Sequence, residues 1–176
     1  RAMGIEIELV ADRITVSGNG LNGLLDPKRD LFLGNSGTTM RILPGILAGC
    51  NFEVTLSGDE SLSKRPMARI IDPLKKMGVN IGSGKGKSLP PITVNGGSVK
   101  PIEYTTPVPS AQVKSCILLA GLHADGITRV TEPFMSRDHT ERMLEFYGGR
   151  ISRAALTVSL KGKTELQGRD MFIPGD

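Results

Sequence analysis

The stretch Leu31-Phe32-Leu33-Gly34-Asn35-Ser36-Gly37-Thr38-Thr39-Met40-Arg41 decides the fold of this chain. An extended apolar lead-in is followed by small and hydroxylated residues, which is where a helix should begin. A helix start leaves backbone N–H groups unpaired and carries partial positive charge, and Arg41 lies one turn inside the predicted helix. Two interpretations stay open: the stretch is a simple helix cap, or it is an anion site to which glycine allows close approach and Arg41 offers two parallel hydrogen bonds.

The composition is that of a globular chain suited to small anionic ligands. Of its 176 residues, 39% are hydrophobic and 23% are charged, which is enough for one well-filled domain. The formal net charge is +4, and the Lys and Arg residues are dispersed rather than gathered in one block. Aromatic residues are scarce, with no Trp, two Tyr and five Phe, so stacking on bases is poorly supplied. Small anions therefore fit the chain better than nucleic acid does.

The sequence carries no signal of a membrane, secretory or metal-binding protein. No apolar run approaches the roughly 20 residues that span a bilayer, and residues 1–4 lack a signal-peptide pattern. We therefore expect a soluble, cytoplasmic chain. Cys50 and Cys116 lie within or beside apolar segments and are predicted to be buried reduced thiols. His123 and His139 form no metal pair, so we expect no metal site.

Two short sequence matches indicate an internal repeat. The segment 46–49 recurs at 118–121, and the segment 77–81 recurs at 147–151 at nearly the same offset. Chance similarity between amphipathic helices is the alternative explanation of such short matches. If the repeat is real, the chain is built from copies of one supersecondary unit.

The residue pattern within each copy predicts that strands and helices follow one another in the order β-α-β-α-β-β. Apolar helix patterns, alternating strand patterns and glycines at helix ends mark the boundaries. In one copy the elements are expected at 31–33, 37–49, 52–56, 65–77, 80–81 and 92–94. In the other they are expected at 102–105, 110–122, 127–131, 138–147, 150–151 and 156–160. The chain is thus predicted to be a single domain in which residues 31–97 form a second repeat and residues 102–161 form a third.

Two features of the sequence depart from a regular series of complete repeats. The segments 5–9 and 13–16 alternate as strands do, so residues 1–20 look like the last two strands of a first repeat whose beginning is absent. Pro44 conflicts with an uninterrupted first helix, because an internal proline removes a hydrogen bond and costs about 3 kcal/mol. We expect a bend or a late helix start at Pro44.

Two further helix starts carry residues that can bind an anion. Arg65 precedes Pro66, which suits a first helical turn, and Arg65 could join Arg41 over one anion. The alternative is a solvated loop arginine. Ser110 and Gln112 begin the next helix, where Ser110 is either an N-cap or a ligand and Gln112 offers both a donor and an acceptor.

The last helix start is the segment Ser136-Arg137-Asp138-His139-Thr140-Glu141. Arg137 occupies a place similar to that of Arg65, while capping by Asp138 or Thr140 is the alternative reading of this segment. Repeats of one unit bring equivalent helix ends to one side of a domain, so the four helix starts together predict a cationic, amide-lined surface. The sequence shows no Ser/His/Asp order, no P-loop spacing and no convincing carboxylate pair.

These motifs resemble the EPSP synthase family, the enolpyruvyl transferases that are the target of glyphosate. The segments 34–41, 62–67, 110–115 and 136–141 appear in the family's order and spacing over nearly the whole chain. The Ser-Ala-Gln-Val-Lys form of the third segment is similar to the class II, glyphosate-tolerant subgroup. The resemblance implies a mixed α/β fold: one of the two domains of the enolpyruvyl transferase fold, with β-α-β-α-β-β units around a pseudo-threefold axis.

The resemblance also implies ligands and a reaction. The family transfers an enolpyruvyl group from phosphoenolpyruvate to shikimate 3-phosphate in aromatic amino-acid biosynthesis, without a metal or an organic cofactor. Phosphoenolpyruvate would face Asn35, Gly37, Thr38 and Arg65. Shikimate 3-phosphate would be held by Ser110, Ala111, Gln112, Ser136 and Arg137. Arg41 has a weaker assignment, with a purely structural role as the alternative, and the Gly37 position would control access for glyphosate as an inhibitor.

The resemblance further implies that this chain is one part of a longer enzyme. The family's amino-terminal Lys-Ser pair and following Arg have no counterpart here, and residues 162–176 look like the start of a crossover to a second domain. That domain carries the groups assigned to proton transfer, so we expect no catalytic residue in this chain and no activity from it alone.

The missing domain and small anions are therefore the expected partners, with no nucleic acid and no membrane. Two alternatives stay open. One is the related UDP-N-acetylglucosamine enolpyruvyl transferase, whose loop cysteine resembles neither Cys50 nor Cys116. The other is a non-catalytic module that binds anions or RNA through the same repeat fold.

Overall fold

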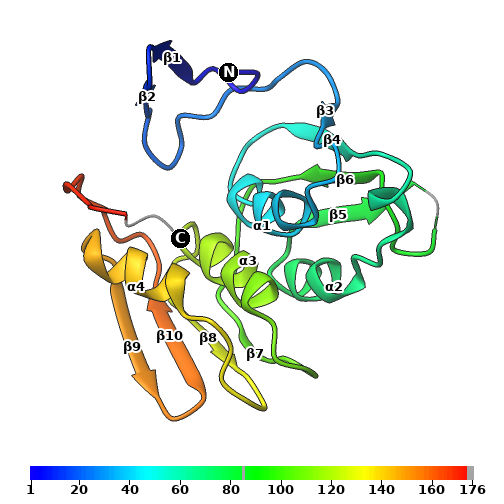
Figure 1. Cartoon of the computed structure of the whole chain (residues 1–176). Helices are drawn as coiled ribbons and strands as arrows, with labels where there is room; N and C mark the ends of the chain where they lie inside the picture. Colours follow the sequence, from blue (N-terminus) through cyan, green and yellow to red (C-terminus); the bar gives the residue numbers. More distant parts are fainter. Residues whose placement is uncertain (85, 174–176) are drawn as a thin grey trace.

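The computed structural model describes residues 1–84 and 86–173 and contains two β-α-β-α-β-β units (Figure 1). The first unit comprises β3 (Leu31–Phe32), α1 (Gly37–Leu47), β4 (Glu53–Ser57), α2 (Ala68–Lys76), β5 (Asn80–Ser83) and β6 (Ile92–Asn95). The second unit comprises β7 (Glu103–Thr105), α3 (Ala111–Gly121), β8 (Ile127–Thr131), α4 (His139–Phe146), β9 (Arg150–Ala154) and β10 (Thr157–Lys161). The predicted succession of elements is confirmed in both copies.

The two units build sheets of the same topology. The first sheet has the strand order β3-β4-β6-β5 and the second has the order β7-β8-β10-β9. In each sheet the first strand is parallel to its neighbour, and the other pairs are antiparallel. The recurrence of short segments at a similar offset thus reflects two copies of one supersecondary unit.

Helices α1, α2 and α3 lie between the two sheets, and α1 packs directly against α3 (Figure 1). Gly45 permits this approach, because a Cβ added there would lie only 2.2 Å from the backbone oxygen of Cys116. The buried core is formed mainly by Ile, Leu, Val and Met side chains, as the scarcity of aromatic residues requires. The two units therefore share one core across the α1–α3 contact.

Two helix boundaries differ from the sequence prediction. Pro44 lies inside α1 and is buried, and the helix starts at Gly37 rather than late, because core packing offsets the missing hydrogen bond. The second helix of the first unit was expected to begin at residue 65 but begins at Ala68. A 3-10 turn, η1 (Leu62–Lys64), precedes it, and Arg65 is extended because a residue before proline is restricted from the helical region.

The amino-terminal segment forms a separate hairpin. Strands β1 (Glu6–Val10) and β2 (Arg13–Ser17) are antiparallel, as their alternation predicted, and among the described residues they pair only with each other. The hairpin stands apart from the two units in Figure 1. The assignment of residues 1–20 to an incomplete first repeat stays a prediction. The predicted crossover 162–176 contains no helix or strand from residue 162 to residue 173, and residues 174–176 lie outside the described chain.

Both cysteines are buried free thiols, as predicted. Burial raises the pKa of the Cys116 thiol to about 12 and also raises the pKa of Cys50. These thiols are therefore poor nucleophiles, because the thiolate is the reactive form.

None of the helices in the described parts of the chain is both long enough and apolar enough to cross a bilayer.

The buried hydroxyl of Thr128 is predicted to lower the stability of the core. Its side chain is fully buried in β8, and its hydroxyl finds no hydrogen-bond partner among the described residues. We expect Thr128→Val to raise the free energy of unfolding by about 1 kcal/mol, because it removes an unpaired buried hydroxyl. Urea unfolding measures this change. Thr106→Val is the control, since the buried Thr106 hydroxyl donates to the Thr131 backbone oxygen; a loss of stability in Thr128→Val would contradict the expectation.

Candidate functional site

The start of α1 is capped as the sequence predicted. Ser36 has an extended backbone, and its side-chain oxygen accepts a hydrogen bond from the Thr39 N–H at 3.1 Å. Gly34, with φ +58°, turns the chain from β3 toward this cap in a conformation that glycine adopts easily. The helix then begins at the buried Gly37, with Thr38 exposed beside it. This cap is compatible with the second interpretation of the stretch, in which the same helix start also binds an anion.

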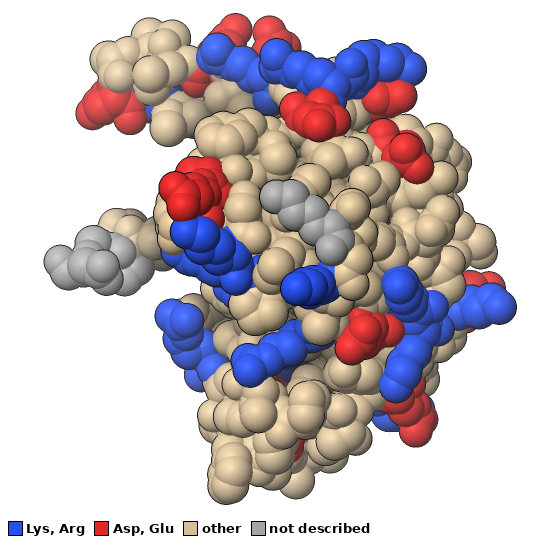
Figure 2. All heavy atoms as spheres, turned by 90° about the vertical axis from the view of Figure 1, so that its right-hand side faces the viewer, with Lys and Arg blue, Asp and Glu red and all other residues tan. Residues whose placement is uncertain are grey.

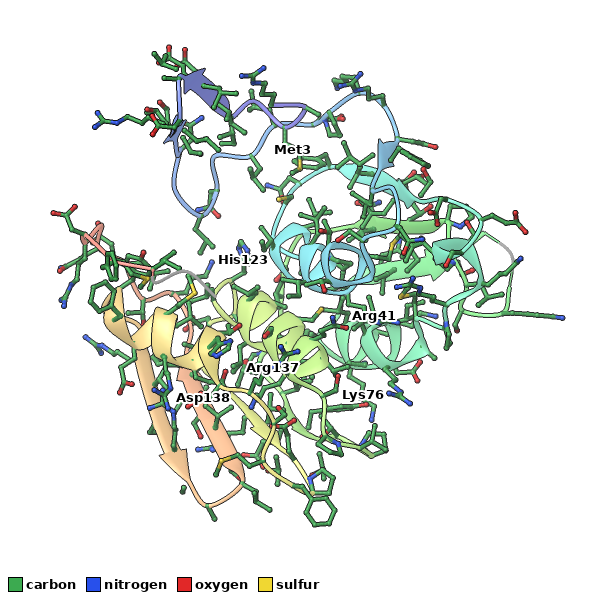
Figure 3. All side chains as sticks on the ribbon, viewed as in Figure 1. Met3, Arg41, Lys76, His123, Arg137 and Asp138 are labelled. Carbon is green, nitrogen blue, oxygen red and sulfur yellow. The ribbon has the colours of Figure 1, made fainter. Side chains whose placement is uncertain are left out.

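Two guanidinium groups converge beside Gly37. A Cβ added at Gly37 would lie 2.8 Å from Nη1 of Arg65 and 3.1 Å from Nη1 of Arg41. Partial burial, together with repulsion from Arg65 and Arg69, lowers the pKa of Arg41. Figure 3 shows Arg41 where α1, α2 and α3 approach one another. Positive charge is thus concentrated at a point that a side chain at residue 37 would otherwise fill.

Both guanidinium groups are hydrogen-bonded to neutral partners. Arg65 Nη2 donates to Asn35 Oδ1 at 2.6 Å, and Arg41 Nη1 donates to Gln112 Oε1 at 3.1 Å. Asp59 accepts a hydrogen bond from Asn35 Nδ2 at 2.7 Å and so orients the amide that faces Arg65. Within residues 1–84 and 86–173, neither Arg41 nor Arg65 forms an ion pair with a carboxylate. An incoming anion would therefore meet two cations that lack a direct counter-charge.

Gln112 joins the two helix starts of the two units. Its Nε2 donates to Thr38 Oγ1 at 2.9 Å, while its Oε1 accepts from Arg41. Ser110 caps α3 through its side chain, which accepts from the Val113 N–H at 3.4 Å, and Ala111 is the first residue of that helix. The structure therefore brings together residues predicted from separate motifs, namely Asn35, Gly37, Thr38, Arg65 and Gln112.

Glu132, which was not among the predicted site residues, links Ser110 to Ser136. Its Oε1 accepts the Ser110 backbone N–H at 2.9 Å, and its Oε2 accepts the Ser136 hydroxyl at 2.9 Å. Glu132 follows β8 directly and is 4% exposed. Burial alone would raise the pKa of Glu132, but hydrogen bonds from Lys114, Ser110 and Ser136 outweigh burial and hold that pKa below its ordinary value.

Lys114 of α3 lies between two buried carboxylates. Its Nζ is 2.7 Å from Glu132 Oε2 and 2.7 Å from Glu141 Oε1, and the three side chains are almost completely buried. Burial alone would lower the pKa of Lys114, but the hydrogen bonds and charges of the two glutamates outweigh it and raise that pKa. Sequence reasoning missed this network, although a lysine inside the largely apolar run 113–119 could have signalled it. Glu132 offered no such signal, because it reads as a polar residue at a strand end.

The structure places Arg137 apart from the Arg41–Arg65 pair. Arg137 is exposed, and Figure 3 shows it beside α3 on the side of α4, whereas Arg41 lies on the side of α1 and α2. Asp138 does not cap α4 through its side chain but pairs with Arg142 at 2.8 Å. The predicted residues thus form two groups, one around Arg41 and one around Glu132, which meet at the start of α3. Their ligand assignments stay predictions.

Charges of both signs are mixed on the face drawn in Figure 2. Figure 2 shows Lys and Arg side chains interspersed with Asp and Glu over one face of the molecule. This agrees with the dispersed charge of the sequence. Contacts with an extended polyanion depend on a concentrated basic surface, whereas the paired guanidinium groups beside Gly37 suit a small anion.

Comparison with known proteins gives consistent matches. A family model described as EPSP synthase (3-phosphoshikimate 1-carboxyvinyltransferase) matches residues 1–176. Curated relatives named 3-phosphoshikimate 1-carboxyvinyltransferase, from Bacillus cereus (strain B4264) and Bacillus thuringiensis subsp. konkukian (strain 97-27), are each 53% identical over 176 residues. The match covers 100% of this chain and 41% of each relative, so the chain spans about two fifths of their length.

Solved structures show the same fold. The EPSP synthase from Acinetobacter baumannii matches with a TM-score of 0.91 and 47% identity, covering 95% of this chain and 38% of that one. The enolpyruvyl transferase NikO from Streptomyces tendae has a TM-score of 0.54 and 19% identity, covering 92% of this chain and 38% of its own, so that likeness concerns the fold alone. The predicted fold class, an α/β domain of the enolpyruvyl transferase fold, is confirmed.

Proposed function

Since the chain belongs to the EPSP synthase family, we propose that it binds shikimate 3-phosphate and forms part of a phosphoenolpyruvate site within a longer enzyme. The enzyme transfers the enolpyruvyl group of phosphoenolpyruvate to a hydroxyl of shikimate 3-phosphate. The observation that carries the proposal is the convergence of Arg41 and Arg65 beside Gly37, with Gln112 of the other unit at the same place. The relatives are named 3-phosphoshikimate 1-carboxyvinyltransferase, and a carboxyvinyl group is the same group as enolpyruvyl.

The chemistry of phosphoenolpyruvate fits this convergence. The molecule carries a phosphate and a carboxylate, and a guanidinium group can give either one two parallel hydrogen bonds. Arg65 and Arg41 now donate to neutral oxygens of Asn35 and Gln112, and an anionic oxygen is a stronger acceptor than either amide. We assign phosphoenolpyruvate to the group formed by Asn35, Gly37, Thr38 and Arg65, with Arg41 as an added contact.

Shikimate 3-phosphate is assigned to the second group. Hydroxyl, amide and guanidinium groups at the starts of α3 and α4 can bind both its phosphate and its sugar-like hydroxyls. The residues are Ser110, Ala111, Gln112, Ser136 and Arg137. Gln112 contacts Thr38 and Arg41 as well, so it lies between the two proposed ligands.

The reaction requires protonation of the phosphoenolpyruvate methylene while the sugar hydroxyl gives up its proton and attacks the central carbon. The phosphate then leaves together with a proton of the new methyl group, which restores the double bond of the enolpyruvyl group. This chain contributes positive charge and positioning, which lower the barrier by holding both anions in a reactive arrangement. We propose that the acid and the base come from a second domain of the same protein, which closes over this site and is its partner.

The proposal is tested by calorimetric titration of the chain. We expect saturable binding of shikimate 3-phosphate, and no binding of UDP-N-acetylglucosamine or of an RNA oligonucleotide. Binding of RNA or of UDP-N-acetylglucosamine without shikimate 3-phosphate would overturn the proposal. We also expect no turnover of shikimate 3-phosphate with phosphoenolpyruvate, and turnover by the pure chain would contradict the requirement for a second domain.

Gly37→Ala is expected to weaken phosphoenolpyruvate binding about tenfold or more without loss of stability. The added Cβ forces the Arg65 guanidinium away from its place, but the end of a flexible side chain moves at little cost. Alanine also favours the helix more than glycine does. Titration of the chain with phosphoenolpyruvate at saturating shikimate 3-phosphate, and urea unfolding, measure the two effects. Gly82→Ala, where nothing lies within 4 Å of an added Cβ, is the control, and unchanged affinity in Gly37→Ala would refute the assignment.

A further inference from the structure

We propose that Glu132 is a positioning residue that fixes the start of α3 relative to the segment before α4. Through Glu132, the backbone of Ser110 and the hydroxyl of Ser136 are held at one spacing. Lys114 and Glu141 complete the arrangement. The inference rests on the function proposed above, because its purpose is the binding of shikimate 3-phosphate between these two segments.

The carboxylate of Glu132 has a fixed orientation. One oxygen accepts the Ser110 N–H, and the other accepts both the Ser136 hydroxyl and the Lys114 ammonium. The Glu132 backbone N–H donates to the Leu156 carbonyl at 3.0 Å, which ties Glu132 to the turn between β9 and β10. A carboxylate held at both oxygens and at its own backbone can set the separation of the two serines.

A second link joins α3 to α4. Lys114 also contacts Glu141 in the first turn of α4, and the Ser115 and Thr140 hydroxyl oxygens are 2.6 Å apart. The start of α4 therefore cannot shift along α3 without breaking an ion pair and a hydrogen bond. The segment that carries Ser136 and Arg137 leads directly into this first turn.

The three charged residues of this network, Lys114, Glu132 and Glu141, have uncharged counterparts in the first unit. Counted from the starts of α1 and α2 and from the end of β4, the counterparts are Met40, Ile70 and Gly58. Met40 and Ile70 are fully buried in the core. The same supersecondary unit therefore folds without the charges, so the fold itself does not require them.

The network is also costly to bury. Replacing a buried ion pair or triad by apolar side chains of similar volume is often neutral or stabilising. Here one lysine faces two glutamates, and Glu141 Oε2 has no hydrogen-bond partner among the described residues. The first unit folds without such a network, and in the second unit the network holds two serines that are proposed to bind the ligand. Positioning of these two serines explains why the second unit carries the network despite its cost.

The test compares three variants of the chain by calorimetric titration with shikimate 3-phosphate. The triple variant K114M/E132L/E141I takes its methionine and isoleucine from the first unit. We expect it to unfold at a temperature no lower than the unaltered chain and to bind shikimate 3-phosphate at least about tenfold more weakly. Glu132→Asp keeps the charge but shortens its reach, and we expect it to weaken binding about threefold or more. Glu145→Gln removes an exposed carboxylate of α4 and should leave binding unchanged.

Unchanged affinity in both the triple variant and Glu132→Asp would overturn the inference. If the triple variant does not fold, Glu132→Asp alone decides. If the unaltered chain fails to bind shikimate 3-phosphate, the proposed function fails, and hydrogen exchange of the Ser110 amide then decides on positioning. We expect that exchange to accelerate about tenfold or more in Glu132→Asp, because the N–H loses its acceptor, whereas an unchanged rate would refute positioning.

Discussion

Replacing Lys114 by methionine is expected to lower the free energy of unfolding by about 3–5 kcal/mol near neutral pH. The change leaves Glu132 and Glu141 buried close together without a positive charge between them. Methionine occupies the equivalent position of the first unit, so its shape is compatible with the helix, and the loss reports the unpaired charges. Urea unfolding followed by circular dichroism measures the effect.

The stability lost in Lys114→Met is expected to depend on pH in a defined direction. In the unaltered chain the pKa of Glu132 is lowered, so its stabilisation is complete above the ordinary value of 4.5 and is lost as the pH falls through the folded value. The raised pKa of Lys114 stabilises the fold below the ordinary value of 10.5, and this contribution is lost as the pH rises through the folded value. In Lys114→Met the Glu132 carboxylate loses the ammonium group that helps to hold its pKa down, so we expect the deficit to shrink as the pH falls.

Lys64→Met is the matched control for Lys114→Met. Lys64 pairs with Glu60 at 2.6 Å, but both side chains are largely exposed, and such a pair contributes at most about 1 kcal/mol. A deficit in Lys114→Met that is no larger than that of the control, or one that grows as the pH falls, would contradict the buried network.

Gly45→Ala is expected to lower the free energy of unfolding by about 3 kcal/mol. Alanine in a helix interior normally stabilises it by about 1 kcal/mol relative to glycine, so the expected sign is the reverse of the helix propensity. The reason is the backbone oxygen of Cys116, 2.2 Å from the added Cβ, which cannot move without separating α1 from α3. Thermal and urea unfolding measure the loss.

The same substitution should also impair the site. Arg41 lies on α1 and Gln112 on α3, so a wider helix separation lengthens the hydrogen bond that joins them. We expect weaker binding of phosphoenolpyruvate by the folded fraction of Gly45→Ala. Gly18→Ala, where an added Cβ meets nothing within 4 Å, is the control, and a stabilised Gly45→Ala would disprove the close helix contact.

The succession of elements could be predicted because its signals are local. Ser36 and Ser110 precede apolar helices and cap them through their side chains, and the strand patterns follow at similar distances in both copies. The start of α2 was misplaced because Pro66 suits a first helical turn but also holds Arg65 extended. Both effects are local, and only the surrounding structure decides between them.

The parts of the candidate site could be predicted more easily than their contacts. Each helix start showed its binding groups in the sequence, but the contact of Gln112 with Thr38 and Arg41 depends on the approach of two helices from different units. That approach rests on Gly45, whose role depends on a backbone oxygen 71 residues further along the chain. Neither Lys114 nor Glu132 was predicted: a lysine in an apolar run could have been a signal, whereas Glu132 could be found only once its partners were placed.

The β1–β2 hairpin has a practical consequence for every titration described above. Its strands form a sheet of two and leave apolar side chains in solvent, with Val10 70% and Ile14 65% exposed. Strand edges with exposed apolar residues invite pairing between copies of a chain. Calorimetry at high protein concentration would then record heats of self-association beside those of ligand binding. Dilution experiments and light scattering should therefore accompany each titration, and a hairpin carrying lysine in place of Val10 should suppress the concentration-dependent signal.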